Sequence, residues 1–281
     1  MLLGVQVSTE GKIYEALNRA EALGCNTMQI FARNPQQWRQ VFLGPNDVLE
    51  FNRLQKEYQI KPLFIHIPYL LNMASPHPKL YEGSIEAYIE DMFEAKSLNA
   101  DYIVTHMGSH KETSEEAGLK RFIHAINKIL EKTADINVGI LLENTAGSGS
   151  WLGYKFNHQE KVFQDVKDKA RLGLCLDTAH AYSAGYDISG KDGLQSLLEE
   201  IDNSVGIGQL KLVHLNDTKD MLNSHRDKHE HIGKGNIGLE GMKRIINHPL
   251  LRKVPFILET PKKTDKDDFM NLNTVRKLRN K

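Results

Sequence analysis

The sequence lacks an excess of charge of either sign, because 36 lysine and arginine residues balance 36 aspartate and glutamate residues. Whole-molecule charge therefore does not attract the chain to a polyanion, and this absence counts mildly against a nucleic-acid partner. The sequence also lacks an apolar run of the roughly 20 residues that a membrane-spanning helix needs. The apolar start at Leu2 and Leu3 is too short for a secretion signal. We therefore expect a cytoplasmic protein with no membrane partner.

Cysteine is scarce as well, since Cys25 and Cys175 are the two in the chain and lie far apart. Cys175 sits in the apolar run Leu172–Leu176, so we expect both thiols to pack as small hydrophobic groups without forming a disulfide. A chain of 281 residues buries roughly three quarters of its unfolded surface and needs no metal to fold. Any metal cluster would therefore be functional. Low-complexity linkers are also lacking, which predicts a single domain over residues 1–281.

What the sequence does contain is a regular alternation of short apolar runs with longer amphipathic stretches. The apolar runs, typical of parallel strands covered on both faces, are Leu2–Ser8, Thr27–Ala32, Leu63–Pro68, Tyr102–Gly108, Asn137–Thr145, Arg171–Thr178, Leu210–Asp217 and Pro255–Pro261. The helix-like segments are Lys12–Leu23, Asp47–Tyr58, Ser84–Leu98, Ser114–Ala134, His158–Lys167, Leu194–Asp202, Leu239–Asn247 and Asp267–Leu278. Doubly wound open sheets share this alternation but usually have fewer strands, whereas eight units in about 250 residues match a closed barrel. We therefore predict an α/β fold of the (β/α)8 TIM-barrel class.

Side chains that can bind metal stand at the ends of six successive predicted strands. In chain order they are His66, His106, Glu143, Asp177, His214 and Glu259, with His180 three residues after Asp177. The carboxyl ends of barrel strands meet at one rim, where catalytic groups sit. A single histidine in such a place is most often a hydrogen-bonded structural residue. Six gathered groups, however, carry a desolvation cost that a bound cation offsets, so the set predicts a metal site.

A second group of candidate ligands follows the seventh predicted strand, in the segment His225–His231 (HRDKHEH). Residues two apart in an extended segment share a side, so Asp227 and His229 can chelate one ion together. With His180 they make a set of one aspartate and two histidines. Nitrogen mixed with carboxylate oxygen, without thiolate, favours Zn²⁺ or Mn²⁺ over Ca²⁺ or Mg²⁺.

Several motifs resemble those of the endonuclease IV family of apurinic/apyrimidinic-site nucleases, and the resemblance runs from Gly4 to Pro261. They are FARNPQQW (Phe31–Trp38), HIPYLLN (His66–Asn72), HMGSH (His106–His110), LENTAG (Leu142–Gly147), GLCLDTAH (Gly173–His180), HLNDTK (His214–Lys219), DKH (Asp227–His229) and LETP (Leu258–Pro261). The resemblance implies a TIM barrel that holds three zinc ions. It assigns His66, His106 and a bridging Glu143 to the first ion, Asp177, His214 and Glu259 with Glu143 to the second, and His180, Asp227 and His229 to the third.

The resemblance also implies a reaction, the hydrolysis of a DNA phosphodiester bond on the 5′ side of an abasic site in base excision repair. The expected products are a 3′-hydroxyl and a 5′-deoxyribose phosphate, and trimming of blocked 3′ ends is expected as well. The catalytic residues would be the ligands Glu143, Asp177, His180 and Glu259, so that no side-chain general acid is required. The partner would be double-stranded DNA, and we expect a monomer.

Loops after the second and third predicted strands are expected to read the DNA. Gln36 follows one strand and Tyr69 and Leu70 follow the other, so an amide, an aromatic and an aliphatic group project from one rim. Such groups can wedge into a base stack that has already lost a base. Gln36 departs from family members that insert an arginine there, and we expect Arg33 to supply the missing charge. The alternative is that Tyr69 and Leu70 only anchor their loop.

Two other functions stay open from the sequence. The quartet Glu143, Asp177, His214 and Glu259 resembles the metal site of barrel sugar isomerases and epimerases, which need neither His66 and His106 nor the group around His180. A non-catalytic DNA-lesion binder with structural zinc is the other alternative, although structural zinc favours thiolate-rich shells. Among the remaining histidines, those expected at the surface are His77, His124, His158 and His248.

Overall fold

A closed ring of parallel strands forms the centre of the molecule in a computed structural model that describes residues 1–31, 33–34, 37–38 and 43–280. The strands are β1 (Leu3–Val5), β2 (Met28–Phe31), β3 (Leu63–His66), β4 (Tyr102–His106), β5 (Gly139–Glu143), β6 (Leu172–Asp177), β7 (Leu210–His214) and β10 (Phe256–Leu258). They pair in the order β1-β10-β7-β6-β5-β4-β3-β2. Just after β1, Gln6 bridges to Gln29 and the amide of Val7 donates to the Gln29 carbonyl oxygen at 2.8 Å, which brings the two ends of the sheet together. The predicted TIM-barrel fold is therefore confirmed.

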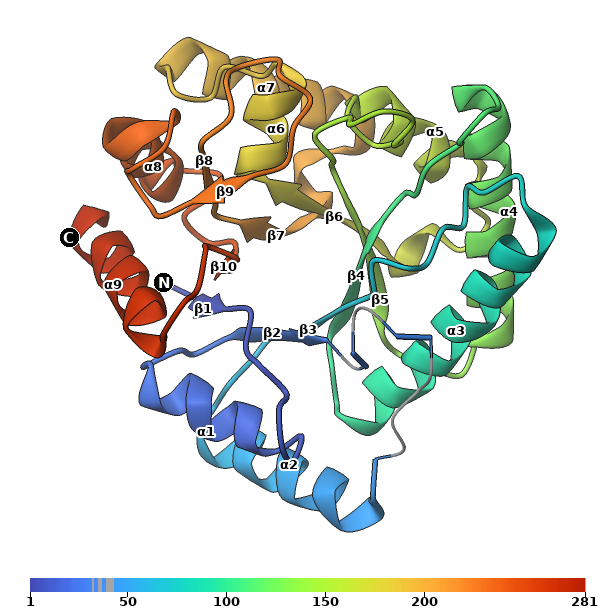
Figure 1. Cartoon of the computed structure of the whole chain (residues 1–281), viewed down its shortest axis with the longest axis horizontal. Helices are drawn as coiled ribbons and strands as arrows, with labels where there is room; N and C mark the ends of the chain where they lie inside the picture. Colours follow the sequence, from blue (N-terminus) through green and yellow to red (C-terminus); the bar gives the residue numbers. More distant parts are fainter. Residues whose placement is uncertain (32, 35–36, 39–42, 281) are drawn as a thin grey trace.

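Helices surround the strands as an outer ring (Figure 1). They are α1 (Glu15–Ala22), α2 (Pro45–Glu57), α3 (Pro78–Ser97), α4 (Glu115–Lys132), α5 (Phe156–Asp165), α7 (Lys191–Val205), α8 (Gly238–Asn247) and α9 (Asp265–Leu278), with short 3₁₀ turns at Lys169–Arg171 and Ile207–Gln209. All eight predicted helical segments overlap one of these. The third begins at Pro78, earlier than the predicted Ser84, because proline is well suited to the first turn of a helix. Among the residues that the structure describes, no helix is long and apolar enough to span a membrane.

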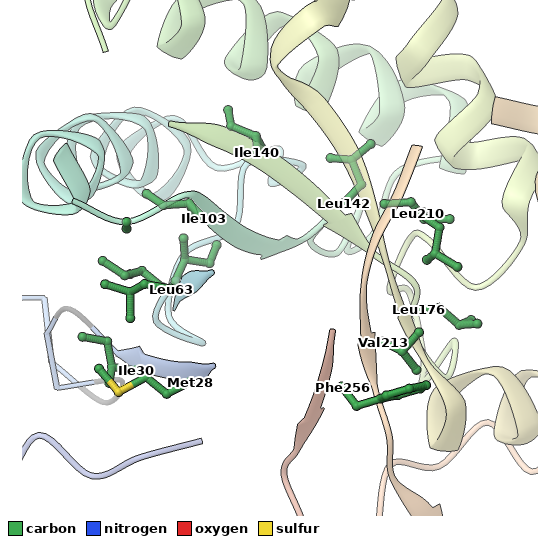
Figure 2. Packing of buried hydrophobic residues seen from close by; sticks show 14 of the residues in the cluster. Met28, Ile30, Leu63, Ile103, Ile140, Leu142, Leu176, Leu210, Val213 and Phe256 are labelled. Carbon is green, nitrogen blue, oxygen red and sulfur yellow. The ribbon is translucent and has the colours of Figure 1, made fainter. Parts of the chain in front are cut away.

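The alternation of side chains along each strand separates two apolar layers. One layer lies between the strands and the helices, and Figure 2 shows members of it from Met28 on β2 round to Phe256 on β10. The other fills the inside of the barrel and consists of Phe64, Val104, Leu141, Cys175, Leu212 and Ile257. Side chains that share a face of a strand recur every second residue. The next inward residue on each of these strands is therefore two residues nearer the carboxyl end. Those positions hold His66, His106, Glu143, Asp177, His214 and Glu259.

Two small elements near this rim were not expected from the sequence. The helix α6 (Thr178–Ala184) follows β6 directly, and the Asp177 side chain caps it by accepting from the His180 amide at 2.8 Å. A two-stranded antiparallel ribbon pairs β8 (Asp217–Thr218) with β9 (His229–Glu230). Elements this short show no periodicity in the sequence. Both matter for the site, because α6 carries His180 and β9 carries His229.

Candidate metal centre

Glu143 lies in the middle of the rim and contacts histidines on both sides. Its Oε2 atom lies 3.0 Å from Nε2 of His66 and 3.0 Å from Nε2 of His106. Its Oε1 atom lies 3.0 Å from Nδ1 of His214. Each carboxylate oxygen therefore faces a different group of nitrogen donors, which is the arrangement that a bridging ligand requires.

Two candidate ligand groups share Glu143. The first consists of His66, His106 and Glu143, and the second of Glu143, Asp177, His214 and Glu259; within each, the ligand atoms lie within 4.8 Å of one another. In the second group, Nδ1 of His214 lies 3.3 Å from Oε2 of Glu259 and 3.9 Å from Oδ2 of Asp177. Mixed nitrogen and carboxylate groups of this size can hold divalent cations.

A third group forms where α6, β9 and the loop before β9 meet. Asp227 places Oδ2 at 3.2 Å from Nε2 of His180 and Oδ1 at 3.3 Å from Nε2 of His229. Asp177 joins the same two histidines in a set whose ligand atoms lie within 4.8 Å. The structure thus brings together all nine residues proposed as ligands, and it adds Asp177 as a neighbour of the third group as well as the second.

The charges and unpaired atoms of this cluster fit bound cations. Burial alone would lower the pKa of His180, but the carboxylates of Asp177 and Asp227 outweigh it and raise that pKa well above its ordinary value. Burial likewise raises the pKa of Glu143, yet the neighbouring imidazoles of His106 and His214 hold it well below its usual range. The Nε2 atoms of His106 and His229 are buried and make no hydrogen bond within the described residues. In the neutral imidazole, each of these nitrogens can offer its lone pair to a metal ion held between it and the facing carboxylate.

The candidate ligand groups contain no cysteine. Cys175 lies beneath the site, in the layer inside the barrel. Burial raises the pKa of its thiol to about 12, so it stays protonated near neutral pH. Both cysteines are free and buried, as expected. The available ligands are therefore imidazole nitrogen and carboxylate oxygen.

Main-chain carbonyl groups orient three of the histidines. Nδ1 of His66 lies 2.7 Å from the Ile67 carbonyl oxygen, and Nδ1 of His180 lies 2.9 Å from that of Asn144. Nδ1 of His229 lies 2.9 Å from the Glu259 carbonyl oxygen. A carbonyl oxygen can only accept, so Nδ1 carries the hydrogen in each neutral ring and Nε2 then points its lone pair toward the site.

Amide side chains that we did not predict hold the carboxylates or the main chain of Asp177 and Glu259. Asn216 donates to Oδ2 of Asp177 at 2.7 Å and accepts from the Glu259 amide at 2.8 Å. Asn144 accepts from the Asp177 amide at 2.7 Å. Gln29 donates to Oε1 of Glu259 at 2.7 Å. The signal for the asparagines was present, because Asn144 directly follows one candidate ligand and Asn216 comes two residues after another.

The rim beside the cluster is hollow on two sides of Tyr69. One cavity of about 750 Å³ is lined by Tyr69, Phe31, His229 and Glu259 among others, and a smaller one of about 230 Å³ by Tyr69, Trp151, His106 and Asp227 among others. Tyr69 is 58% exposed and packs edge-on against Phe31, while Leu70 is half-buried. Both side chains thus stand at the mouth of the site, and Gln36 lies outside the described residues.

The structure corrects two expectations from the sequence. Arg33 does not supply charge at the surface, because its side chain is fully buried and its Nε donates to Asp91 at 2.7 Å. It also donates to the carbonyl oxygens of Trp38 and Ala87, so it holds the loop from inside. His158 is likewise buried and not at the surface, since the segment before α5 covers it and the Gly153 amide donates to its Nδ1 at 2.9 Å. Its sequence position in a polar helix gave no sign of this cover.

A protein-family model described as a xylose isomerase-like TIM barrel matches residues 17–278. The fold and the site thus define a TIM barrel of this class with a candidate centre for several metal ions. A probable endonuclease 4 from Halothermothrix orenii is 42% identical over 278 residues, covering 99% of this chain and 100% of the relative. One from Methanoculleus marisnigri is 40% identical and covers 99% of both chains.

Solved structures agree with the sequence relatives. The crystal structure of endonuclease IV from Thermus thermophilus superposes with a TM-score of 0.88 at 35% identity, covering 99% of this chain and 98% of that one. The chain therefore belongs to the endonuclease IV family, and it is an enzyme of the nuclease class. A D-tagatose 3-epimerase-like protein superposes with a TM-score of 0.75 at 20% identity, with 99% and 97% coverage, which shows a shared fold alone.

Proposed function

We propose that this nuclease is a zinc-dependent repair enzyme that cleaves the DNA phosphodiester bond 5′ to an abasic site, leaves a 3′-hydroxyl and a 5′-deoxyribose phosphate, and trims blocked 3′ ends. The observation that carries the proposal is the convergence of nine nitrogen and oxygen ligands around Glu143, with Asp227 joining His180 to His229. Sugar isomerases and epimerases do not need this third group. The similarity to the endonucleases named above supports the same choice.

The residues would hold three ions. We assign His66, His106 and Glu143 to the first, Glu143, Asp177, His214 and Glu259 to the second, and His180, Asp227 and His229 to the third. Divalent ions at such a site, Zn²⁺ foremost and Mn²⁺ as a substitute, supply Lewis-acid activation of water and neutralise charge on a phosphate. Four carboxylates would face six positive charges, so the loaded rim would be positive although the chain as a whole is neutral.

The protein's own groups prepare the site for this chemistry. Carbonyl groups hold the hydrogens of His66, His180 and His229 on Nδ1, so each Nε2 can bind a metal ion without a change of tautomer or ring orientation. Glu143, Asp177, His180 and Glu259 act through ligation in this proposal and not as acids or bases. Glu143, Asp177 and His180 are buried, which keeps bulk water from screening the charges at the rim.

Substrate choice is assigned to the rim loops. We propose that Tyr69 and Leu70 enter the duplex next to the lesion, and that Gln36 does so from the neighbouring loop. The exposure of Tyr69 between two cavities supports this role, because a side chain fixed in the core could not reach a base stack. We further propose a monomer in the cytoplasm, and the two free thiols suit a reducing compartment.

The test is a duplex with one tetrahydrofuran site, an abasic analogue, labelled on the lesion strand and incubated with zinc-loaded protein. We expect one incision on the 5′ side of the lesion and an upstream fragment that a DNA polymerase extends. The same duplex with an intact base is the control. Incision on the 3′ side, equal cleavage of the control, or isomerisation of a sugar would contradict the proposal.

A further inference from the structure

We infer that Gln29 is a positioning residue of the metal centre, which sets the tautomer of His214 and the rotamer of Glu259 so that both present ligand atoms to one ion. The inference rests on the proposed metal-dependent function. Gln29 is not among the candidate ligands, and it stands on β2, a strand that contributes no ligand.

The position of Gln29 inside the barrel is unusual for an amide. Its backbone is in register with Phe64 on β3, and its side chain is completely buried. The residues at this level on the other strands are apolar, among them Val104 and Leu212. A buried amide is costly unless it is hydrogen-bonded, so its partners indicate why it is there.

Gln29 makes three side-chain hydrogen bonds, and two of them reach candidate ligands. Its Nε2 donates to Oε1 of Glu259 at 2.7 Å and to Oε1 of Gln6 at 2.8 Å. Its Oε1 lies 2.8 Å from Nε2 of His214. One side chain thus joins two ligands of the same group, carried by β7 and the end of β10.

The order of donors and acceptors follows from the carboxylate. An ionised Glu259 can only accept, so the NH₂ group of Gln29 must face it and the carbonyl oxygen must face His214. His214 must then carry its hydrogen on Nε2, which leaves the lone pair on Nδ1. Nδ1 lies 3.0 Å from Glu143 and 3.3 Å from Oε2 of Glu259, the oxygen that Gln29 leaves free.

His214 differs in this respect from three neighbouring histidines. His66, His180 and His229 donate from Nδ1 to carbonyl oxygens of the main chain, which no substitution removes. His214 uses the opposite nitrogen and depends on a side chain. A single substitution of Gln29 should therefore free the orientation and tautomer of His214 in the second ligand group.

The experiment replaces Gln29 with methionine, which keeps the volume and removes the three side-chain hydrogen bonds. Zn²⁺ affinity is measured by titration in competition with a fluorescent chelator, beside the melting temperature of the metal-free protein. We expect one of three zinc ions to bind about 10- to 100-fold more weakly, as is typical when a partner of a metal ligand is lost. Gln55→Met, at a buried glutamine on α2, is the matched control and should bind zinc as the wild type does.

The outcomes separate the two proposals. Unchanged zinc affinity in Gln29→Met beside a wild type that binds three ions overturns the inference alone, even if the variant melts earlier. A wild type that binds no zinc overturns the proposed function and the inference with it. A second measurement uses the unaltered zinc-loaded protein: ¹⁵N shifts of His214 should show a hydrogen on Nε2, and a hydrogen on Nδ1 would overturn the inference.

Discussion

The carboxylate of Asp227 lies 3.2 Å from Nε2 of His180, although Asp227 belongs to the loop before β9 and His180 to the first turn of α6. This contact joins two segments that only the fold brings together. His180 also connects the third ligand group to the two groups that share Glu143, since its Nδ1 lies 3.4 Å from Oε1 of Glu143. Asp227 itself pairs with His180 and His229, which both belong to the third group, so removing it should disturb that group and spare the other two.

We predict that Asp227→Ala loses one metal ion, still binds abasic duplex, and cleaves it about 100-fold more slowly or worse. The loss corresponds to roughly 3 kcal/mol of missing charge stabilisation at the reaction centre. Single-turnover cleavage beside metal content is the measurement. Wild-type cleavage by a variant with one fewer ion would show that the third group is not catalytic.

Glu143→Ala should lose more than one metal ion, because its two oxygens face different ligand groups. Plasma mass spectrometry of the purified protein measures the metal content, with close to three ions expected in the wild type. Glu50→Ala, on the exposed side of α2, is the control and should keep all of them. A wild type that is active with one ion or none would contradict the trinuclear assignment.

Tyr69→Ala and Leu70→Ala should weaken binding to an abasic duplex while metal content and melting temperature stay nearly constant. The reason is that Tyr69 is exposed and Leu70 only half-buried, so their loss costs little packing. Phe93→Ala removes a comparably exposed aromatic ring from α3 and serves as the control. A large drop in melting temperature with unaltered binding would instead assign the two residues to loop anchoring.

Arg33→Met should lower the free energy of unfolding by about 3–5 kcal/mol, because it leaves the buried carboxylate of Asp91 without its partner. The double variant Arg33→Met, Asp91→Leu should recover part of this loss. Arg53→Met removes two exposed ion pairs on α2, with Glu50 and Glu57, and should change stability by less than about 1 kcal/mol. Urea denaturation distinguishes the variants, and equal effects at both arginines would contradict a structural role for Arg33.

We predict that the buried imidazole of His158 makes the free energy of unfolding depend on pH. Burial lowers its pKa below the ordinary value of 6.5 and outweighs the opposing charge of Glu115. The unfolded chain therefore binds the proton more readily, so the contribution of His158 to stability falls as pH drops below about 6.5. The stability difference between wild type and His158→Asn should shrink between pH 7.5 and 5. His124→Asn, on the exposed face of α4, should show no such trend.

Local sequence patterns predicted the strands and the position of the candidate ligands at the carboxyl ends of those strands. Five observed strands end in a candidate ligand, and Glu259 directly follows a sixth, β10; the observed range of each lies inside the predicted one. The reason is that alternation along a strand and the polarity of a parallel barrel are properties of short segments. His66 stands two residues after Phe64, and this spacing alone places it above the apolar layer.

The parts that were missed depend on contacts between distant segments. Arg33 is charged and lies in a polar stretch, and only its pairing with Asp91 on α3 shows that it is buried. His158 is covered by a loop whose path the sequence does not reveal. Gln29 occupies the middle of an apolar strand, where its type is visible but its partners are not.

The sequence by itself determined the order of strands and helices and the side chains that end each strand. The tertiary structure decided which atom of each side chain faces the centre. His214 and Glu259 come from separate strands, and a glutamine near the start of the chain selects the nitrogen of one and the oxygen of the other. Hydrogen bonds across the barrel set this choice, because donor and acceptor roles depend on neighbours in space and not along the chain.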